Sequence, residues 1–299
     1  MTTEQKGIGQ VFFAYLLWGL MPIYWKTVQH IASDEILASR IVWSFIFTVL
    51  LISVLRDIPK LKLDLKNLWG DKKAFFSLMI ASYLVTANWF TFIYAVNSGE
   101  LVQTSLGYYI NPLISVLLGI LFLGERLSDA QKAAVGIAAA GVFILTFTYG
   151  ELPWISLVLA GSFAFYGLIK KQAKVGAITG LAIETFFVLP FAFVYMVYLF
   201  TQDSLQFLES SPVTMLLLML SGVATALPLL LYASGTKRIP LYLSGFIQYI
   251  APTIMLVLGV VLYNEPFSQA EWVGFSFIWV ALALFSISKF IQIKRSLQK

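Results

Sequence analysis

The segment Tyr109–Glu125, YINPLISVLLGILFLGE, decides the fold because a second copy of it occurs later in the chain. The second copy, YIAPTIMLVLGVVLYNE, runs from Tyr249 to Glu265, and seven of its seventeen positions are identical without a gap. The identities include a proline, a glycine and a glutamate in register, whereas chance matches between apolar segments are mostly leucine and isoleucine. We therefore interpret the two segments as a duplicated helix and the chain as two related halves.

The composition of the chain is that of a membrane protein. Only 12% of its 299 residues are charged and 59% are hydrophobic, whereas a soluble domain has about 25% charged residues. The apolar surplus must face lipid, so we expect an all-α integral membrane protein. The net charge of +5 comes from basic residues in short loops, which indicates contact with the membrane surface and no nucleic-acid partner. The absence of cysteine and the single histidine, His30, predict no metal site and no cofactor.

The apolar stretches of the chain are long enough for ten membrane-spanning helices. A helix needs roughly 20 apolar residues to cross a hydrocarbon core of about 30 Å. The basic segment from Arg56 to Lys73 is the longest connection and is predicted to be a loop. The predicted spans are residues 8–28, 36–55, 74–96, 101–123, 133–149, 152–169, 178–200, 213–235, 240–263 and 272–290.

The basic residues predict the orientation of these spans. Eighteen of the 20 lysines and arginines fall in the two tails and in every second loop, and the other two, Lys26 and Arg40, fall within spans. The loops of the opposite side carry acidic residues and no basic ones. We therefore predict that both termini are cytoplasmic.

The two copies of the duplicated helix are the fourth and the ninth span. Because they are five spans apart, the second copy crosses the membrane in the opposite direction. The start of the second half supports this pairing, because Tyr166–Leu168 echoes Trp18–Leu20. The predicted fold is therefore ten transmembrane helices in two inverted five-helix repeats, residues 1–150 and 151–299. Inverted repeats that meet at the membrane midplane are the usual scaffold of alternating-access transporters.

Motifs spread over nearly the whole chain carry a family resemblance. They are Tyr15–Gly19, Asp34–Leu37 with Arg40, Trp43 and Ser44, Gly107–Pro112, Gly124–Leu127 and Phe277–Ala283. With these motifs the chain resembles the drug/metabolite transporter superfamily, in its EamA-type branch and RarD subgroup. The second repeat departs from the Gly-Glu ending that is typical of the superfamily, because Asn264 precedes Glu265. The resemblance implies a multi-pass permease of the bacterial inner (plasma) membrane that exports small organic metabolites or drugs.

The predicted function is secondary transport by alternating access, through a central cavity between the two repeats. Its partners are then a small-molecule substrate and the lipid bilayer, and the sequence leaves a homodimer open. A channel, a lipid flippase and a membrane-embedded lipid-modifying enzyme are the alternatives. An enzyme would need convergent acids, histidines or a nucleophile–base pair, and the acids of this chain lie almost all in loops. We therefore expect no enzymatic activity.

Polar residues share one face of the predicted fourth span. Thr104, Tyr108 and Asn111 follow one another at helical spacing. The register-matched positions of the ninth span include Ser244 and Gln248. Because polar side chains within a span usually face the bundle interior or a water-filled cavity, we predict that these residues line the substrate cavity. The alternative is that they form hydrogen bonds between packed helices.

Three further residues are predicted to belong to the cavity wall. Asn88 lies on a polar face of the third span, where it is costly unless it faces a cavity or another helix. Trp18 and Trp43 offer aromatic rings for stacking on a planar substrate.

Two of the charged residues within predicted spans have a candidate role. Arg40 is expected to contact an anionic group or to form a gate ion pair, and the alternative is a structural pair with Asp34, Glu35 or a backbone carbonyl. Glu184 is the candidate coupling group, which would take up a proton when poorly solvated. The alternative for Glu184 is a structural ion pair with a lysine of the adjacent loop, such as Lys170.

Three prolines within spans are candidates for breaks in their helices. Pro112 and Pro252 occupy matching positions of the two repeats, and Pro228 lies in the eighth span. A proline removes one backbone hydrogen bond, so it kinks the helix or leaves a carbonyl free. The alternative is a kink that packing tolerates and that has no role in transport.

Overall fold

A computed structural model gives the structure of the chain and describes residues 2–123, 129–149, 152–236, 238–239 and 247–297. All regular structure within these ranges is helical. The elements are α1 (Thr3–Thr27), α2 (Ser33–Val54), α3 (Ile58–Gly70), α4 (Lys72–Asn97), α5 (Leu101–Leu123), α6 (Asp129–Tyr149), α7 (Trp154–Gln172), α8 (Ala177–Thr201), α9 (Gln206–Glu209), α10 (Pro212–Thr236), α12 (Ile250–Val257), the π-helical turn η1 (Leu258–Leu262) and α13 (Gln269–Leu297).

The chain is an all-helical integral membrane protein, as the composition predicts. Among the described helices, α1, α2, α4, α8, α10 and α13 are long and apolar enough to cross a membrane. The predicted span at 101–123 coincides with α5. Of the predicted span at 240–263, residues 240–246 lie outside the described residues, and the rest forms α12 and η1.

The N-terminal helix begins ahead of its predicted span. Helix α1 begins at Thr3, whereas the prediction began at residue 8. Thr2 Oγ1 accepts a hydrogen bond from Gln5 N at 3.2 Å, and Gln5 Oε1 accepts one from Thr2 N at 2.9 Å. This reciprocal pair is a capping box, which starts a helix in polar sequence that a hydropathy criterion does not detect.

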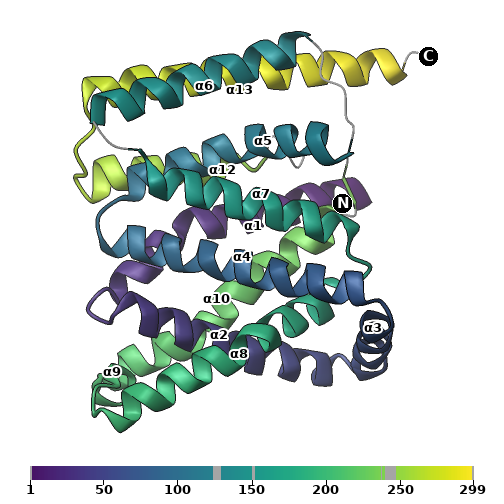
Figure 1. Cartoon of the computed structure of the whole chain (residues 1–299), viewed down its shortest axis with the longest axis vertical. Helices are drawn as coiled ribbons and strands as arrows, with labels where there is room; N and C mark the ends of the chain where they lie inside the picture. The colour runs from purple at the N-terminus through teal and green to yellow at the C-terminus, as the bar shows by residue number, and fades with distance from the viewer. Residues whose placement is uncertain (1, 124–128, 150–151, 237, 240–246, 298–299) are drawn as a thin grey trace.

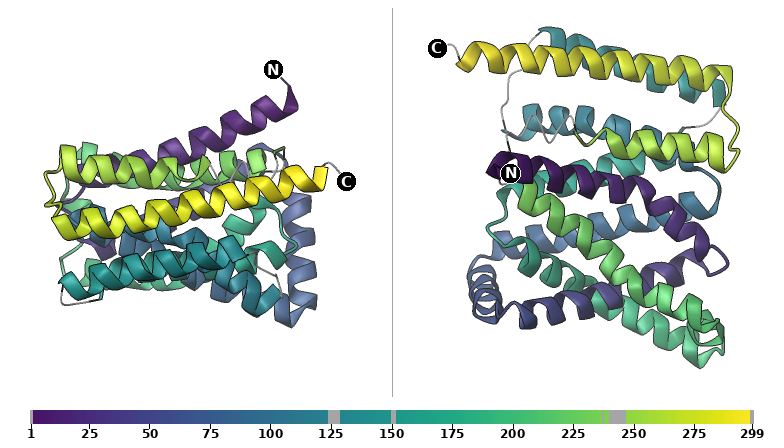
Figure 2. Two further views of the ribbon diagram at one scale, coloured as in Figure 1. Left: turned by 90° about the horizontal axis from the view of Figure 1, so that it is seen from above. Right: turned by 180° about the vertical axis from the view of Figure 1, so that it is seen from behind.

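The predicted loop from Arg56 to Lys73 is wrong, because most of it forms helix α3. Helix α3 lies across the ends of the long helices, at the end of the bundle where both termini lie (Figures 1 and 2). Asp64 holds it in place, since its Oδ2 accepts hydrogen bonds from Gly176 N at 3.2 Å and from Thr179 Oγ1 at 2.5 Å. Asp64 therefore joins α3 to the start of α8.

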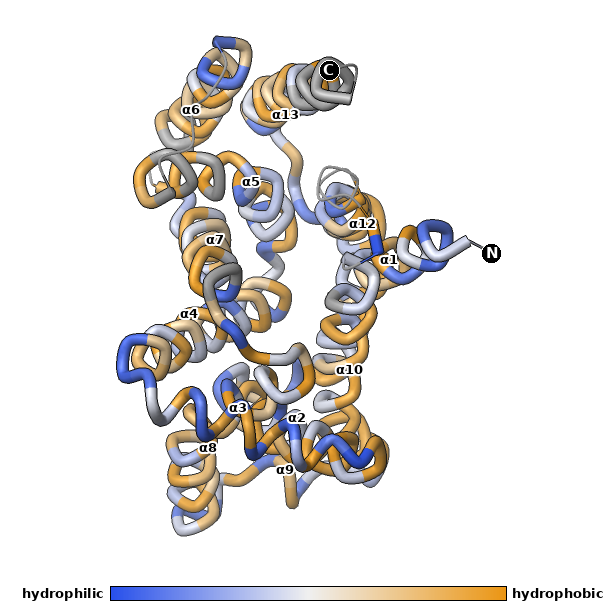
Figure 3. The backbone as a smooth tube through the Cα atoms, turned by 90° about the vertical axis from the view of Figure 1, so that its right-hand side faces the viewer, coloured by the Kyte–Doolittle hydropathy of each residue, from blue (hydrophilic) through white to orange (hydrophobic). Residues whose placement is uncertain are grey.

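The long helices form two columns when the bundle is seen from the end that carries α3 (Figure 3). One column contains α6, α5, α7, α4 and α8, and the other contains α13, α12, α1 and α10. Helix α2 packs against α8 and α10, and the columns also meet where α6 packs against α13 and α5 against α12. Much of the helical backbone in this view is coloured as hydrophobic, as expected for helices that face lipid or other helices.

Glycine allows the closest approach between helices of this bundle. A Cβ atom on Gly222 of α10 would lie 2.3 Å from the Trp43 backbone oxygen of α2. A Cβ atom on Gly107 of α5 would lie 2.8 Å from the Ser156 oxygen of α7. Small residues let membrane helices pack backbone against backbone, and van der Waals contact then stabilises the pair.

A buried glutamate caps α5. Glu265 is 9% exposed, and its carboxylate accepts hydrogen bonds from Leu101 N at 2.9 Å and Val102 N at 2.8 Å. Burial raises the pKa of Glu265 above its ordinary value, and the two backbone donors oppose that change. Glu265 thus ends one copy of the duplicated helix and caps the other. Its register mate, Glu125, lies outside the described residues.

Replacing Glu265 by alanine is expected to lower the free energy of unfolding by about 1–2 kcal/mol, because two backbone donors at the start of α5 lose their acceptor. The measurement is the melting temperature of the purified protein in detergent. Glu209→Ala is the matched control, since Glu209 is an exposed glutamate of α9. Equal melting temperatures of the two variants would show that the cap does not stabilise the fold.

Candidate functional site

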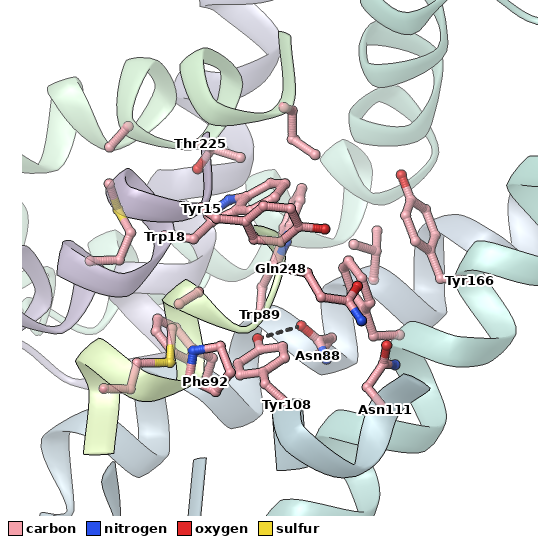
Figure 4. A pocket seen from close by; sticks show the side chains of 18 of the residues that line it. Tyr15, Trp18, Asn88, Trp89, Phe92, Tyr108, Asn111, Tyr166, Thr225 and Gln248 are labelled. Carbon is pink, nitrogen blue, oxygen red and sulfur yellow. Dashed lines mark hydrogen bonds between the residues drawn. The ribbon is translucent and has the colours of Figure 1, made fainter. Parts of the chain in front are cut away.

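A cavity lies in the middle of the bundle, between the two columns of helices. Side chains from α1, α2, α4, α5, α7 and α10 and from residues 248–255 line it. Its empty space amounts to about 890 Å³, a figure that includes the part open to solvent. Figure 4 shows Tyr15, Trp18, Tyr108 and Gln248 around this space.

The lining residues occupy the central parts of their helices. Trp18 belongs to α1, Asn88 to α4, Tyr108 to α5 and Thr225 to α10. Each is at least seven residues from both ends of its helix. The cavity therefore lies near the mid-depth of the bundle, where transporters with repeated halves place their substrate sites.

The structure brings six of the nine predicted cavity residues together around this space, although the repeats lie far apart in the sequence. They are Trp18, Arg40, Asn88, Tyr108, Asn111 and Gln248.

The three other predicted residues are not part of the described cavity wall. Thr104 is fully buried, and its hydroxyl donates to the Glu100 backbone oxygen one turn earlier at 3.1 Å. Trp43 is half-buried in α2, where its backbone oxygen faces Gly222. Ser244 lies outside the described residues.

Two amide side chains of the cavity wall also join helices. Asn88 Nδ2 donates to the Leu159 backbone oxygen at 3.0 Å, and Asn111 Nδ2 donates to the Ala160 oxygen at 3.0 Å. The Tyr108 hydroxyl donates to Asn88 Oδ1 at 3.3 Å (Figure 4). These side chains therefore line the cavity and also form hydrogen bonds between packed helices.

The duplicated helices meet each other beside the cavity. The rings of Tyr109 and Tyr249 are stacked, with centroids 6.3 Å apart and planes at 21°. The Tyr109 hydroxyl and Thr253 Oγ1 share a hydrogen bond of 2.6 Å, and Ser105 Oγ donates to the Pro252 oxygen at 2.8 Å. Matching positions of the two halves thus form one interface.

Arg40 lines the cavity and is only 8% exposed. Its Nε donates a hydrogen bond to Thr225 Oγ1 at 2.8 Å. The guanidinium carbon lies 5.1 Å from the Trp25 ring centroid and 4.4 Å from the Trp89 ring centroid. Cation–π attraction to the two rings therefore stabilises the charge within the bundle.

The structural ion pair considered for Arg40 is not formed. Asp34 accepts hydrogen bonds from the Tyr195 hydroxyl at 2.5 Å and from the Glu35 backbone. The Glu35 carboxylate accepts from the backbone nitrogens of Gln206 and Phe207 at the start of α9. Both acids thus bind groups at the end of the bundle that carries α9, and neither of them pairs with Arg40.

Glu184 lies directly behind the cavity wall. It is 2% exposed, accepts a hydrogen bond from the Tyr166 hydroxyl at 3.0 Å, and forms an ion pair with Lys170. Tyr166 lines the cavity, whereas Glu184 does not. The sequence analysis named Lys170 as a structural ion-pair partner of Glu184, and the structure contains this pair. A coupling role for Glu184 stays a prediction.

The candidate helix breaks do not interrupt the helices. Helices α5 and α10 continue through Pro112 and Pro228, and Pro252 lies in the first turn of α12. A proline has no N–H, so the carbonyl four residues earlier has no donor within its own helix.

The prolines of α1, α5 and α10 share one relation to the cavity. Each stands four residues after a lining residue, so the helix lacks one backbone hydrogen bond at the level of the wall. The pairs are Trp18 with Pro22, Tyr108 with Pro112 and Ala224 with Pro228. The same spacing relates Gln248 to Pro252, just ahead of α12.

The sequence-based prediction missed several aromatic residues of the wall, including Tyr15, Trp25 and Tyr166. The match of Tyr166–Leu168 to Trp18–Leu20 could have identified Tyr166, because Trp18 was already a candidate. Among the described residues, no three His, Asp or Glu side chains lie close enough together to hold a metal ion.

The fold and the cavity define a polytopic helical membrane protein with an internal cavity. The EamA-like transporter family matches this chain twice, over residues 5–147 and 152–287. The chain therefore belongs to the EamA-like transporter family, and it is a bacterial membrane permease of the drug/metabolite superfamily, in the RarD subgroup.

The similarity to individual relatives extends over nearly the whole chain. "Uncharacterized transporter YojE" of Bacillus subtilis is 48% identical over 287 residues, which cover 95% of each chain. "Protein RarD" of Escherichia coli is 41% identical over 282 residues and 94% of each chain. One solved crystal structure matches with a TM-score of 0.58 at 17% identity, over 94% of this chain and 97% of that one. At this identity the last match shows the fold alone.

Proposed function

We propose that the protein is a secondary transporter that exports small organic molecules by alternating access. The observation that carries this proposal is the cavity at mid-depth, whose wall comes from both halves of the chain. A site at this depth is reached from either side only if the halves move against each other. The relatives named transporters, and not enzymes, support the same class of function.

The contacts between helices support ten spans in two inverted repeats, residues 1–150 and 151–299. Helix α1 packs against α10 and α12, and α7 packs in the same way against α4 and α5. If α7 begins the second repeat, α7, α10 and α12 correspond to α1, α4 and α5. The contacts of α1 with α10 and α12 then match those of α7 with α4 and α5. The contacts α2–α8, α5–α12 and α6–α13 each join a helix to its own counterpart. The two separate family matches, which divide near residue 150, support the same boundary.

The distribution of charge supports a location in the plasma membrane with both termini cytoplasmic. The termini and α3 lie at one end of the bundle (Figures 1 and 2). Helix α3 carries Lys60, Lys62 and Lys66. Basic residues next to membrane spans are concentrated on the cytoplasmic side.

Labelling of an introduced cysteine tests alternating access without knowledge of the substrate. The natural chain has no cysteine, so Ala224→Cys would place a single thiol at the cavity wall. We expect a membrane-impermeant thiol reagent to label this thiol from either side of a proteoliposome. Leu208→Cys in α9 and Lys66→Cys in α3 are the controls, each expected to be labelled from one side only.

The labelling pattern also gives the result that contradicts the proposal. If the reagent reached Ala224→Cys from one side only under every condition, or from neither side, the cavity would not alternate between the two faces. Labelling from both sides with ion currents through the same protein would favour a channel.

A further inference from the structure

The charge of Arg40 is not neutralised within the described part of the protein. Arg40 belongs to neither of the ion pairs found there, which join Lys132 to Asp129 and Lys170 to Glu184. Its Nε binds Thr225, whereas Nη1 and Nη2 have no hydrogen-bond partner among the described residues. Of the described residues that line the cavity, Arg40 is the only charged one. A buried guanidinium without a counter-ion is costly, so a ligand that supplies one is stabilised.

The groups around Arg40 leave its terminal nitrogens available to a ligand. The Trp25 and Trp89 rings lie next to the guanidinium, and Thr225 binds its Nε. An oxyanion beside Arg40 would therefore meet the unused N–H donors of Nη1 and Nη2, in the forked geometry that carboxylates and sulfonates accept.

The second repeat has a buried charge at a comparable position that does have a counter-ion. Leu37–Arg40 of α2 and Leu181–Glu184 of α8 share Leu and Ala at their first two positions, and this match sets Arg40 against Glu184. Both are buried charges on the second helix of their half. Glu184 has Lys170 of its own half as counter-ion. Arg40 has no such partner, so its counter-ion is to be sought in the cavity.

We propose that the cavity binds a small organic anion, with its carboxylate or sulfonate on Arg40 and its apolar body among the aromatic side chains. This inference rests on the proposed transport function, because it names the substrate class of the same cavity. Rings of Tyr15, Trp18, Phe92 and Tyr108 line the remaining wall. Such a wall favours an aromatic or apolar body over a bare inorganic ion, because the ion would lose its hydration without apolar contact in return.

Two probes that differ in charge alone test the substrate class. Benzenesulfonate is anionic, and benzenesulfonamide is a neutral molecule of nearly the same shape. Binding to the purified full-length protein is followed by tryptophan fluorescence, since Trp18, Trp25 and Trp89 line the cavity. We expect the wild-type protein to bind benzenesulfonate about tenfold more tightly than benzenesulfonamide.

Variants of Arg40 assign the preference to this residue. Arg40→Gln is expected to remove the preference by weakening benzenesulfonate binding about tenfold, with a much smaller effect on benzenesulfonamide binding. Arg40→Lys is expected to keep part of the preference for benzenesulfonate. Its ammonium group retains the positive charge but lacks the paired N–H donors of the guanidinium. Arg56→Gln is the matched control, because Arg56 is an exposed arginine beyond the end of α2. The comparison of the two probes on the wild-type protein does not depend on the folding of any variant.

The outcomes separate this inference from the transport function. Equal wild-type affinity for the two probes, or a preference that survives in Arg40→Gln, would overturn the anion site. If Ala224→Cys were labelled from both sides in that case, the proposed transport function would stand and only the anion site would fail. A clear preference for benzenesulfonate together with one-sided labelling would support the anion site and overturn alternating access.

Discussion

Replacing Gly222 by alanine is expected to lower the free energy of unfolding by about 3 kcal/mol or more, because the added methyl group forces α2 and α10 apart. The new Cβ atom would lie 2.3 Å from the Trp43 backbone oxygen, 2.4 Å from its carbonyl carbon and 2.8 Å from the Ser44 nitrogen. These are backbone atoms, which cannot turn aside as a flexible side chain does. The melting temperature in detergent and the fraction of monodisperse protein measure the effect.

A second glycine provides the matched control. Gly161 lies in α7, and a Cβ atom built on it would meet nothing within 4 Å. Gly161→Ala is therefore expected to leave stability unchanged or raise it by about 0.5–1 kcal/mol, since alanine favours the helix. If both variants melted at the same temperature, the close approach of α2 and α10 would not limit the packing of the bundle.

Replacing Lys170 by methionine is expected to destabilise the protein by about 3 kcal/mol, because the Glu184 carboxylate stays buried without its counter-ion. The carboxylate is 2% exposed, whereas the lysine side chain is 26% exposed. The remaining bond from the Tyr166 hydroxyl does not carry a positive charge. Melting temperatures in detergent at neutral pH measure the loss, with Lys174→Met as a control at an exposed lysine of the same connection.

The double variant Lys170→Met with Glu184→Gln separates this ion pair from a general loss of packing. A neutral amide at position 184 needs no counter-ion, so we expect the double variant to regain most of the lost stability. A double variant as unstable as Lys170→Met alone would contradict the pair.

The helical spans could be predicted from the sequence because a lipid environment imposes a simple length and composition on each helix. The predicted span at 101–123 coincides with α5 as far as the described residues extend. Helix α3 could not be predicted in this way, because it lies across the bundle end and alternates lysines with leucines. The start of α1 was missed for a related reason, since the capping box of Thr2 and Gln5 lies in polar sequence.

The cavity could be predicted only in part, because a face of one helix does not show which other helix it meets. Tyr108 and Asn111 lie on a polar face and line the cavity, whereas Thr104 lies on the same face and is buried against its own helix. The register match to the second repeat identified Gln248. Arg40 was recognised as a buried charge, but the choice between an acid and tryptophan rings as its neighbours depends on how the helices pack.

The prolines that follow Trp18, Tyr108 and Ala224 have a mechanical consequence for the bundle. A helix that lacks one backbone hydrogen bond bends more easily at that level than elsewhere along its length. The three turns that lack this hydrogen bond lie at the depth of the cavity. We therefore expect α1, α5 and α10 to bend at the cavity, while the helical segments on either side of it stay straight.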